Sequence, residues 1–270
     1  MLSLKLPLHS SEISLSAIGT RAEKRLAPLG GLMGLQCVQA ADTFSADGYL
    51  LDAPELLPPK TKGFRHVVKT DLPPWISGEW ARLLRYGTFA AARRGLPVFL
   101  LHGCLLDGNE NGGTLLFADS GAGKSTTAVR YRAQGGSCRG DDIILCELLP
   151  DALYAYPLPT MSYYSQHWSP KLRYPFQPCV RIRQILLLKR GETEERIAPV
   201  NSLEWRARLA HSLSFHWCQY GCRFSPALLQ WTGDRLLDVV YTLSERFAPL
   251  ALEAQWSGDL RHILEGKAPC

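Results

Sequence analysis

The stretch LLFADSGAGKSTTAVRYRAQGGSCRGDD, residues 115–142, decides the fold. An apolar run of strand length leads into a glycine-rich segment, a Lys-Ser pair follows, and Gly135-Gly136 ends the next helix-like segment. A strand, a glycine-rich turn and a helix start in this order are the context typical of a phosphate-binding loop. We therefore predict a strand over residues 113–118, a loop, and a helix over residues 124–134.

The chemistry of such a loop is local. Backbone N–H groups of residues 120–125 can surround an anion, and the positive end of the helix dipole favours it. Lys124 can reach the β and γ phosphates of a nucleoside triphosphate, and the Ser125 hydroxyl can bind Mg²⁺. Gly121 and Gly123 permit conformations that a side chain resists. The predicted nucleotide-binding residues are Asp119, Ser120, Gly121, Ala122, Gly123, Lys124, Ser125 and Thr126.

Two features depart from a general ATPase pattern. Ala118 stands where such loops have a glycine, and it is the smallest alternative. The adjacent Asp141 and Asp142 follow the segment GGSCRG instead of an apolar strand. In a phosphoryl transferase one carboxylate can hold Mg²⁺ while another accepts the proton of an attacking hydroxyl. The pair therefore favours transfer over hydrolysis, although a polar turn before the next strand is the alternative interpretation.

The combination of His102-Gly103, the loop Asp119–Ser125 and the Asp141-Asp142 pair resembles the catalytic domain of the HPr kinase/phosphorylase family. The resemblance covers residues 97–149, and Asp142 follows Ser125 at the spacing that the family shows. It implies an α/β fold of the phosphoenolpyruvate-carboxykinase-like P-loop kinase type, a mixed sheet with flanking helices. The glycine-rich segment that bifunctional members carry after the aspartate pair is not found here, so the resemblance is closer to a stand-alone kinase.

The resemblance also implies roles for individual residues. Ser125 and Asp141 would bind the metal, Lys124 would hold phosphates, and Asp142 would be the base that takes a proton from a hydroxyl. His102 would lie near the transferred phosphate; a histidine with a structural hydrogen bond at the end of a strand is the alternative. The predicted catalytic residues are thus His102, Lys124, Asp141 and Asp142, with ATP or another nucleoside triphosphate and Mg²⁺ as cofactors.

The remaining pattern predicts one compact chain with a β-rich N-terminal part, residues 1–76, packed on a catalytic core, residues 77–270. We expect short strands and turns before residue 76 and a helix over residues 79–94. Aromatic residues, prolines, Lys171 and Arg173 mark residues 154–178 as a loop that could line an acceptor groove. The other expected elements are strands at 97–101, 143–149 and 182–189 and helices at 202–218, 234–246 and 258–265.

Composition narrows the possible partners. The net charge of +5 comes from scattered Lys and Arg, which is not the clustered pattern of nucleic-acid binding. The sequence has no apolar run of about 18 residues, so no membrane-spanning helix is expected. Eight cysteines without a CxxC pair favour reduced thiols in a cytoplasmic protein. A zinc site around Cys218 and Cys222 is a minor alternative.

The sequence therefore predicts a Mg-ATP-dependent kinase whose acceptor is a serine or threonine hydroxyl of a protein or peptide. A small-molecule hydroxyl is the second possible acceptor. A nucleotide-binding regulatory or ATPase module, which hydrolyses without a stable phosphorylated product, is the alternative from another class. A homo-oligomer is possible, and neither a nucleic acid nor a membrane is expected as a partner.

Overall fold

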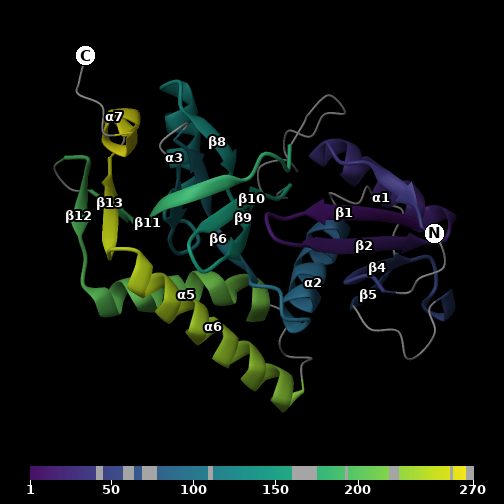
Figure 1. The fold of residues 1–270 in the computed structure, drawn as a ribbon. Coiled ribbons are helices and arrows are strands. Elements are labelled where there is room, and N and C mark those ends of the chain that lie inside the picture. Colours follow the sequence, from purple (N-terminus) through teal and green to yellow (C-terminus); the bar gives the residue numbers. More distant parts are fainter. Residues whose placement is uncertain are drawn as a thin grey trace. The chain divides into compact units, whose positions relative to one another are not determined.

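The structure of the protein is a computed structural model. The residues that it describes form a mixed α/β fold with two mixed sheets and six α-helices, arranged as in Figure 1. None of the described helices has the length and apolar character needed to cross a membrane. The structure describes residues 1–40, 45–56, 64–68, 78–108, 112–159, 175–191, 194–218, 225–255 and 258–265.

The chain forms two compact units, and each unit is made of two segments that alternate along the sequence. The first unit contains Met1–Phe99 and Leu145–Cys179, and the second contains Leu100–Ile144 and Val180–Cys270. The sequence analysis placed a single boundary after residue 76. The structure differs because helix α2 (Glu79–Arg93) packs on strands of the first unit.

The first unit is built on a five-stranded sheet. Its order is β3-β1-β2-β4-β5; β1 pairs antiparallel with β2 and β3, whereas β2, β4 and β5 run parallel. Successive side chains of β1 and β2 point to opposite faces of the sheet, and the inward-facing Leu4, Leu6, Ile13 and Leu15 are completely buried. The strands of this sheet are β1 (Leu2–Pro7), β2 (Glu12–Ile18), β3 (Cys37–Gln39), β4 (Gly48–Leu51) and β5 (Phe64–Val67). Strand β10 (Leu153–Pro157), in the later segment of the unit, is not part of this sheet.

Helix α1 (Thr20–Met33) lies where the sequence predicted only strands and turns. Pro28, Gly30 and Gly31 inside it disfavour a helix locally. Burial outweighs this, since Ala22, Leu26 and Leu29 are fully inaccessible on one face. Gly30 has a packing reason as well, because a Cβ there would lie 2.8 Å from the sulfur of Cys37.

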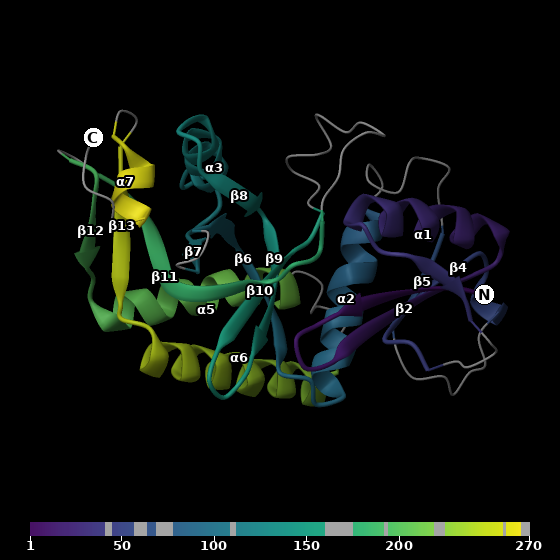
Figure 2. The ribbon, with the colours of Figure 1, turned by 45° about the horizontal axis from the view of Figure 1, so that its top comes forward.

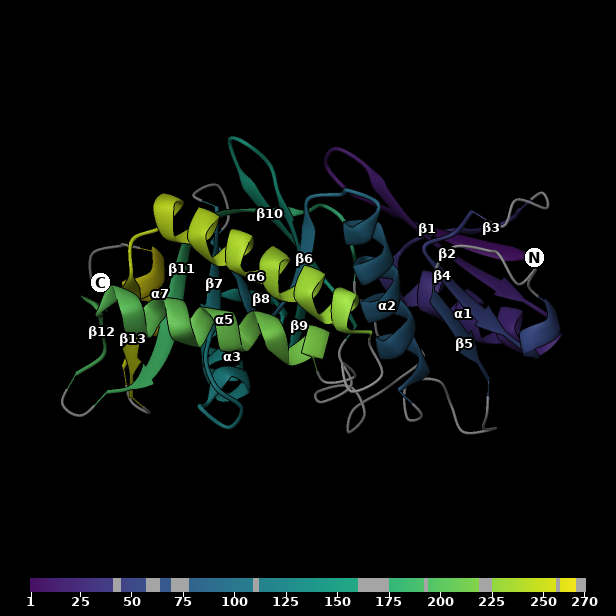
Figure 3. The ribbon, with the colours of Figure 1, turned by 90° about the horizontal axis from the view of Figure 1, so that it is seen from below.

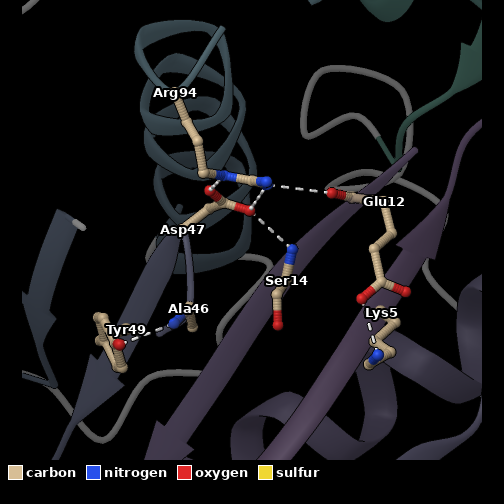
Figure 4. A network of polar contacts seen from close by, with 7 residues as sticks. All are labelled: Lys5, Glu12, Ser14, Ala46, Asp47, Tyr49 and Arg94. Atoms are coloured by element: carbon tan, nitrogen blue, oxygen red, sulfur yellow. Dashed lines mark hydrogen bonds and ion pairs between the residues drawn. The ribbon is translucent and has the colours of Figure 1, made fainter. Parts of the chain in front are cut away.

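The predicted helix over residues 79–94 is confirmed as α2 and is placed by a polar network (Figure 4). The buried Asp47 carboxylate accepts hydrogen bonds from the Ser14 N–H at 2.9 Å and from Arg94 Nε and Nη2 at 3.1 and 3.0 Å. Arg94 also donates to the backbone carbonyl of Glu12. One buried charge thereby joins β2, the residue before β4, and the residue that follows α2.

The second unit contains a mixed sheet in which β7 and β11 are parallel neighbours, and β11 is parallel to β13 (Figure 2). Strand β6 pairs antiparallel with both β7 and β8, and β12 pairs antiparallel with β13. The strands are β6 (Val98–Asp107), β7 (Gly113–Phe117), β8 (Ser137–Gly140), β9 (Ile143–Leu148), β11 (Val180–Arg190), β12 (Arg196–Pro199) and β13 (Leu250–Ala254).

Four of the described helices belong to this unit. Helix α5 packs beside β7 and β11 and runs next to α6 (Figure 3), while α3 packs against β8 and α7. Three predictions needed correction: β6 continues beyond residue 101, β10 forms inside the predicted loop, and α6 begins eight residues earlier than expected. The helices are α3 (Lys124–Ala133), α5 (Ser202–Cys218), α6 (Pro226–Arg246) and α7 (Leu260–Glu265).

The Asp47 network leads to a stability prediction. Asp47→Ala should lower the free energy of unfolding by about 2 kcal/mol, because it removes a buried acceptor of charged and backbone donors. Lys5→Ala breaks an ion pair to Glu12 whose two side chains are about half exposed and should cost less than about 0.5 kcal/mol. Urea unfolding of both variants measures the difference; equal costs would contradict the importance given to Asp47.

Candidate functional site

The glycine-rich loop lies between the buried strand β7 and the first turn of α3. Gly121 and Gly123 have φ angles of 82° and 97°, which side-chain-bearing residues rarely adopt. A Cβ built on either glycine would meet no heavy atom of the described residues within 4 Å. Among the described residues, no side chain caps the N-terminus of α3 by a hydrogen bond. The loop therefore combines positive-φ glycines, open space and an uncapped helix start, which is the arrangement an anion site needs.

Lys124 is held at the base of this loop. Its ammonium group donates to the backbone carbonyls of Ala118 at 2.9 Å and Asp119 at 3.0 Å, and the residue is only 6% exposed. Burial lowers the pKa of Lys124, while the negative charges of Asp142 and Asp119 act in the opposite direction. The ammonium group thus lies in the electrostatic field of both Asp119 in the loop and Asp142.

Ala118 has a structural reason to differ from glycine. It is buried in the core cluster that also contains Leu116, Ala128 and Leu186. Its methyl group therefore fills space between β7, α3 and β11, and its backbone carbonyl still accepts from Lys124. The departure from the glycine pattern is compatible with the loop geometry.

The predicted acidic pair is placed between β8 and β9, and its members differ in exposure. Asp141 is 4% exposed, whereas the Asp142 side chain is 18% exposed. His102 Nε2 lies 3.5 Å from Asp142 Oδ1, and the Gly103 N–H donates to the Asp142 carbonyl at 3.0 Å. Strand β6 thus holds Asp142 by both a side chain and the backbone.

The His102-Gly103 dipeptide has a specific geometric requirement. A Cβ at Gly103 would lie 2.6 Å from the backbone carbonyl of Leu116, so only glycine permits this approach of β6 to β7. His102 is 7% exposed; its ring stacks on Phe215 at 4.3 Å, and its carbonyl accepts from Ser212 Oγ at 2.6 Å. These contacts fix the histidine beside Asp142.

Helix α5 contributes residues that the sequence analysis did not assign to the site. Arg208 forms an ion pair with the Asp119 carboxylate, and His211 Nε2 lies 4.0 Å from the same group. One turn further, Ser212 and Phe215 contact His102. The helical spacing of these four residues is visible in the sequence, but nothing local indicates their partners, which are 89 or more positions away.

The predicted residues therefore fall into a connected group. The negative charge of Asp142 acts on Lys124, and Asp142 contacts His102. Ser125 is exposed and Thr126 half-buried in the first turn of α3. The region containing Lys171 and Arg173 lies outside the described residues, as do Cys222 and the side chain of Cys218.

Two further observations concern ligands and relatives. In the part of the chain that the structure describes, three or more His, Cys, Asp or Glu side chains do not gather into a metal-binding group. A Mg²⁺ site built from one hydroxyl, one carboxylate, phosphate oxygens and water needs no such group. No protein-family model and no curated protein matches the chain.

The loop geometry predicts that a glycine-to-alanine substitution changes the free energy of unfolding in opposite directions at two positions. Gly123→Ala should lower the free energy of unfolding by about 1 kcal/mol, because alanine must adopt a left-handed conformation. Gly233→Ala in α6 also meets open space but lies inside a helix, so it should raise stability by about 0.5–1 kcal/mol. Urea unfolding of both variants tests the loop conformation, and stabilisation by Gly123→Ala would contradict it.

Proposed function

We propose that the second unit binds a nucleoside triphosphate with Mg²⁺ and transfers the terminal phosphoryl group to a serine or threonine hydroxyl of a protein or peptide. The observation that carries the proposal is the buried Lys124, which lies at the base of the open glycine loop and is acted on by the charge of Asp142. An ATPase needs to position only water, whereas a kinase also needs a carboxylate placed for an acceptor hydroxyl. The resemblance to HPr-kinase-like proteins supports a cytoplasmic kinase of this kind.

The residues present fit a bound nucleotide and metal. The amides of residues 120–125 and the uncapped start of α3 would hold the phosphates, and Lys124 would exchange its carbonyl partners for phosphate oxygens. The exposed Ser125 hydroxyl and the Asp141 carboxylate would hold Mg²⁺. The metal, when bound, would offset the negative charge of the phosphates.

Asp142 is the residue suited to proton transfer. Of the two carboxylates it is the more exposed, and it is the one that contacts His102 and interacts with Lys124. Asp142 would accept the proton of the incoming hydroxyl, and His102 would orient the carboxylate. Arg208 carries a positive charge beside the loop and would help to neutralise the phosphate charge, since its present partner Asp119 belongs to the loop itself.

The first test concerns the base. Asp142→Asn should lower the rate of phosphoryl transfer about 100-fold or more while nucleotide binding persists, because an amide cannot accept the proton. Incubation with Mg²⁺, ATP and candidate peptides, proteins or hydroxyl metabolites, followed by mass spectrometry, measures the gain of one phosphate. Asp107→Asn, at the far end of β6, is the matched control and should leave transfer unchanged.

The outcomes of this experiment separate the functional classes. A phosphorylated peptide or protein supports the proposal, and a phosphorylated metabolite redirects it to a small-molecule kinase. Release of phosphate without any phosphorylated acceptor identifies a regulatory ATPase module. Full transfer activity of Asp142→Asn would contradict the assignment of the base.

The second test concerns nucleotide binding. Lys124→Met keeps an unbranched buried side chain but removes the charge, so affinity for ATP should fall about tenfold to 100-fold, the loss expected for a charge-assisted hydrogen bond. Lys189→Met, which breaks a half-exposed pair with Glu204 in the same unit, is the control and should bind ATP normally. Isothermal titration calorimetry measures both variants; normal binding by Lys124→Met would exclude the loop as the phosphate site.

A further inference from the structure

Two buried thiols lie in contact on the paired strands β6 and β8. Cys104 is on β6 and Cys138 is on β8, and their sulfur atoms are 3.6 Å apart. Cys104 is fully buried, whereas Cys138 is 9% exposed. The other described cysteines are Cys37, Cys146 and Cys179. Neither the nucleotide site nor the proposed transfer reaction uses the two thiols.

The two strands that carry these thiols, β6 and β8, pair with a register shift. Leu106 pairs with Cys138 and Leu105 pairs with Gly140, so the register passes over Arg139. Such a bulge leaves one residue outside the ladder and allows a local change of backbone direction. A disulfide needs the sulfurs to move from 3.6 Å to about 2.0 Å, a closure of about 1.6 Å that this bulge can absorb.

The same two strands carry the candidate site. Asp141 directly follows β8, and Cys104 directly follows Gly103, whose N–H donates to the Asp142 carbonyl. His102 is two residues before Cys104 on β6. A movement that draws Cys104 and Cys138 together therefore acts on both chain segments that position the aspartate pair.

The surroundings make the two thiols chemically unequal. The hydrogen bond from Cys104 lowers the pKa of Cys138, and the charge of Arg132, which donates to the Cys138 carbonyl, lowers it further. Cys104 shows the opposite shift, because its proton is shared with Cys138 and because the thiol is buried. Cys138, the more accessible of the two, is thus the better nucleophile.

We infer that Cys104 and Cys138 form a reversible disulfide that displaces the aspartate pair and switches the site off under peroxide. The Cys138 thiolate attacks a peroxide oxygen, so that an S–O bond forms, the O–O bond breaks and hydroxide leaves. The Cys104 sulfur then attacks the sulfenic sulfur, the S–S bond forms, and the hydroxyl leaves with the Cys104 proton as water. Two thiols are oxidised by two electrons, one peroxide is reduced to two waters, and a dithiol reductant reverses the reaction.

The loss of activity rests on the proposed function, but formation of the disulfide does not. A misplacement of catalytic groups by about 1 Å can cost about 100-fold in rate, so the fraction of the closure that reaches the aspartates through β6 and β8 would lower the activity. The displacement also has a readout without catalysis. The hydrogen bond from the Gly103 N–H to the Asp142 carbonyl should weaken, and peptides covering residues 100–106 should exchange backbone hydrogen faster.

The experiment treats the full chain with hydrogen peroxide and then with dithiothreitol. We expect a mass loss of two hydrogens, a 104–138 cross-linked peptide after digestion, faster exchange in residues 100–106, and a fall of about tenfold or more in phosphoryl transfer. Dithiothreitol should restore all four. Cys138→Ala should abolish these changes, whereas Cys179→Ala, which removes a more exposed thiol, should not.

Specific results would overturn the inference. Absence of the 104–138 peptide after peroxide treatment, or its formation without a change in hydrogen exchange or transfer, would each do so. If the Cys138→Ala variant does not fold, Cys104→Ser provides the same test from the other strand. If the reduced protein transfers no phosphate at all, the proposed function fails, while the cross-link and hydrogen exchange still decide whether the disulfide moves the acidic pair.

Discussion

The arrangement of the second unit depends on one buried cation. The Lys124 ammonium group cannot be buried without partners, because an uncompensated charge in the interior costs several kcal/mol. Its partners are the carbonyls of Ala118 and Asp119, so the loop must fold back with these oxygens inward. That reversal leads into the positive-φ conformations of Gly121 and Gly123, which place the helix start beside an open space. The same contacts that satisfy the lysine therefore shape the loop in which we propose that an anion binds.

Helix α5 extends this arrangement from the loop to His102 in the middle of β6. Trp205 packs edge-on against Phe117, the last residue of β7, and so anchors the helix next to the loop. From that anchor, successive turns present Arg208 to Asp119 and Phe215 to His102. One helix thus contacts both the glycine-rich loop and the histidine beside Asp142, which limits how far these groups can move independently.

The sequence indicates the parts of this site that local chemistry determines. The loop and α3 are predictable because glycine conformation, the lysine and helix start signals all lie within a few residues. The partners of α5 are not, since Ser212 and His102 are 110 positions apart and only the tertiary fold joins them. Helix α1 was missed because Pro28 and two glycines oppose a helix, while the burial of Leu26 and Leu29 that stabilises it becomes visible only with the sheet. The grouping of α2 with the strands of the first unit is likewise invisible in the sequence, as this packing is a non-local contact.

The two adjacent aspartates do not share one environment, although the sequence presents them as a pair. Asp142 contacts His102 and interacts with Lys124, whereas the charge of the buried Asp141 acts on the two thiols and opposes their ionisation. Asp142 thus belongs with the basic groups Lys124 and His102, whereas Asp141 belongs with the thiols of β6 and β8. In the proposed reaction the acceptor hydroxyl would therefore approach Asp142. Because the two aspartates are adjacent in the chain, a movement at the thiols would reach Asp142 through the backbone and not through the glycine-rich loop.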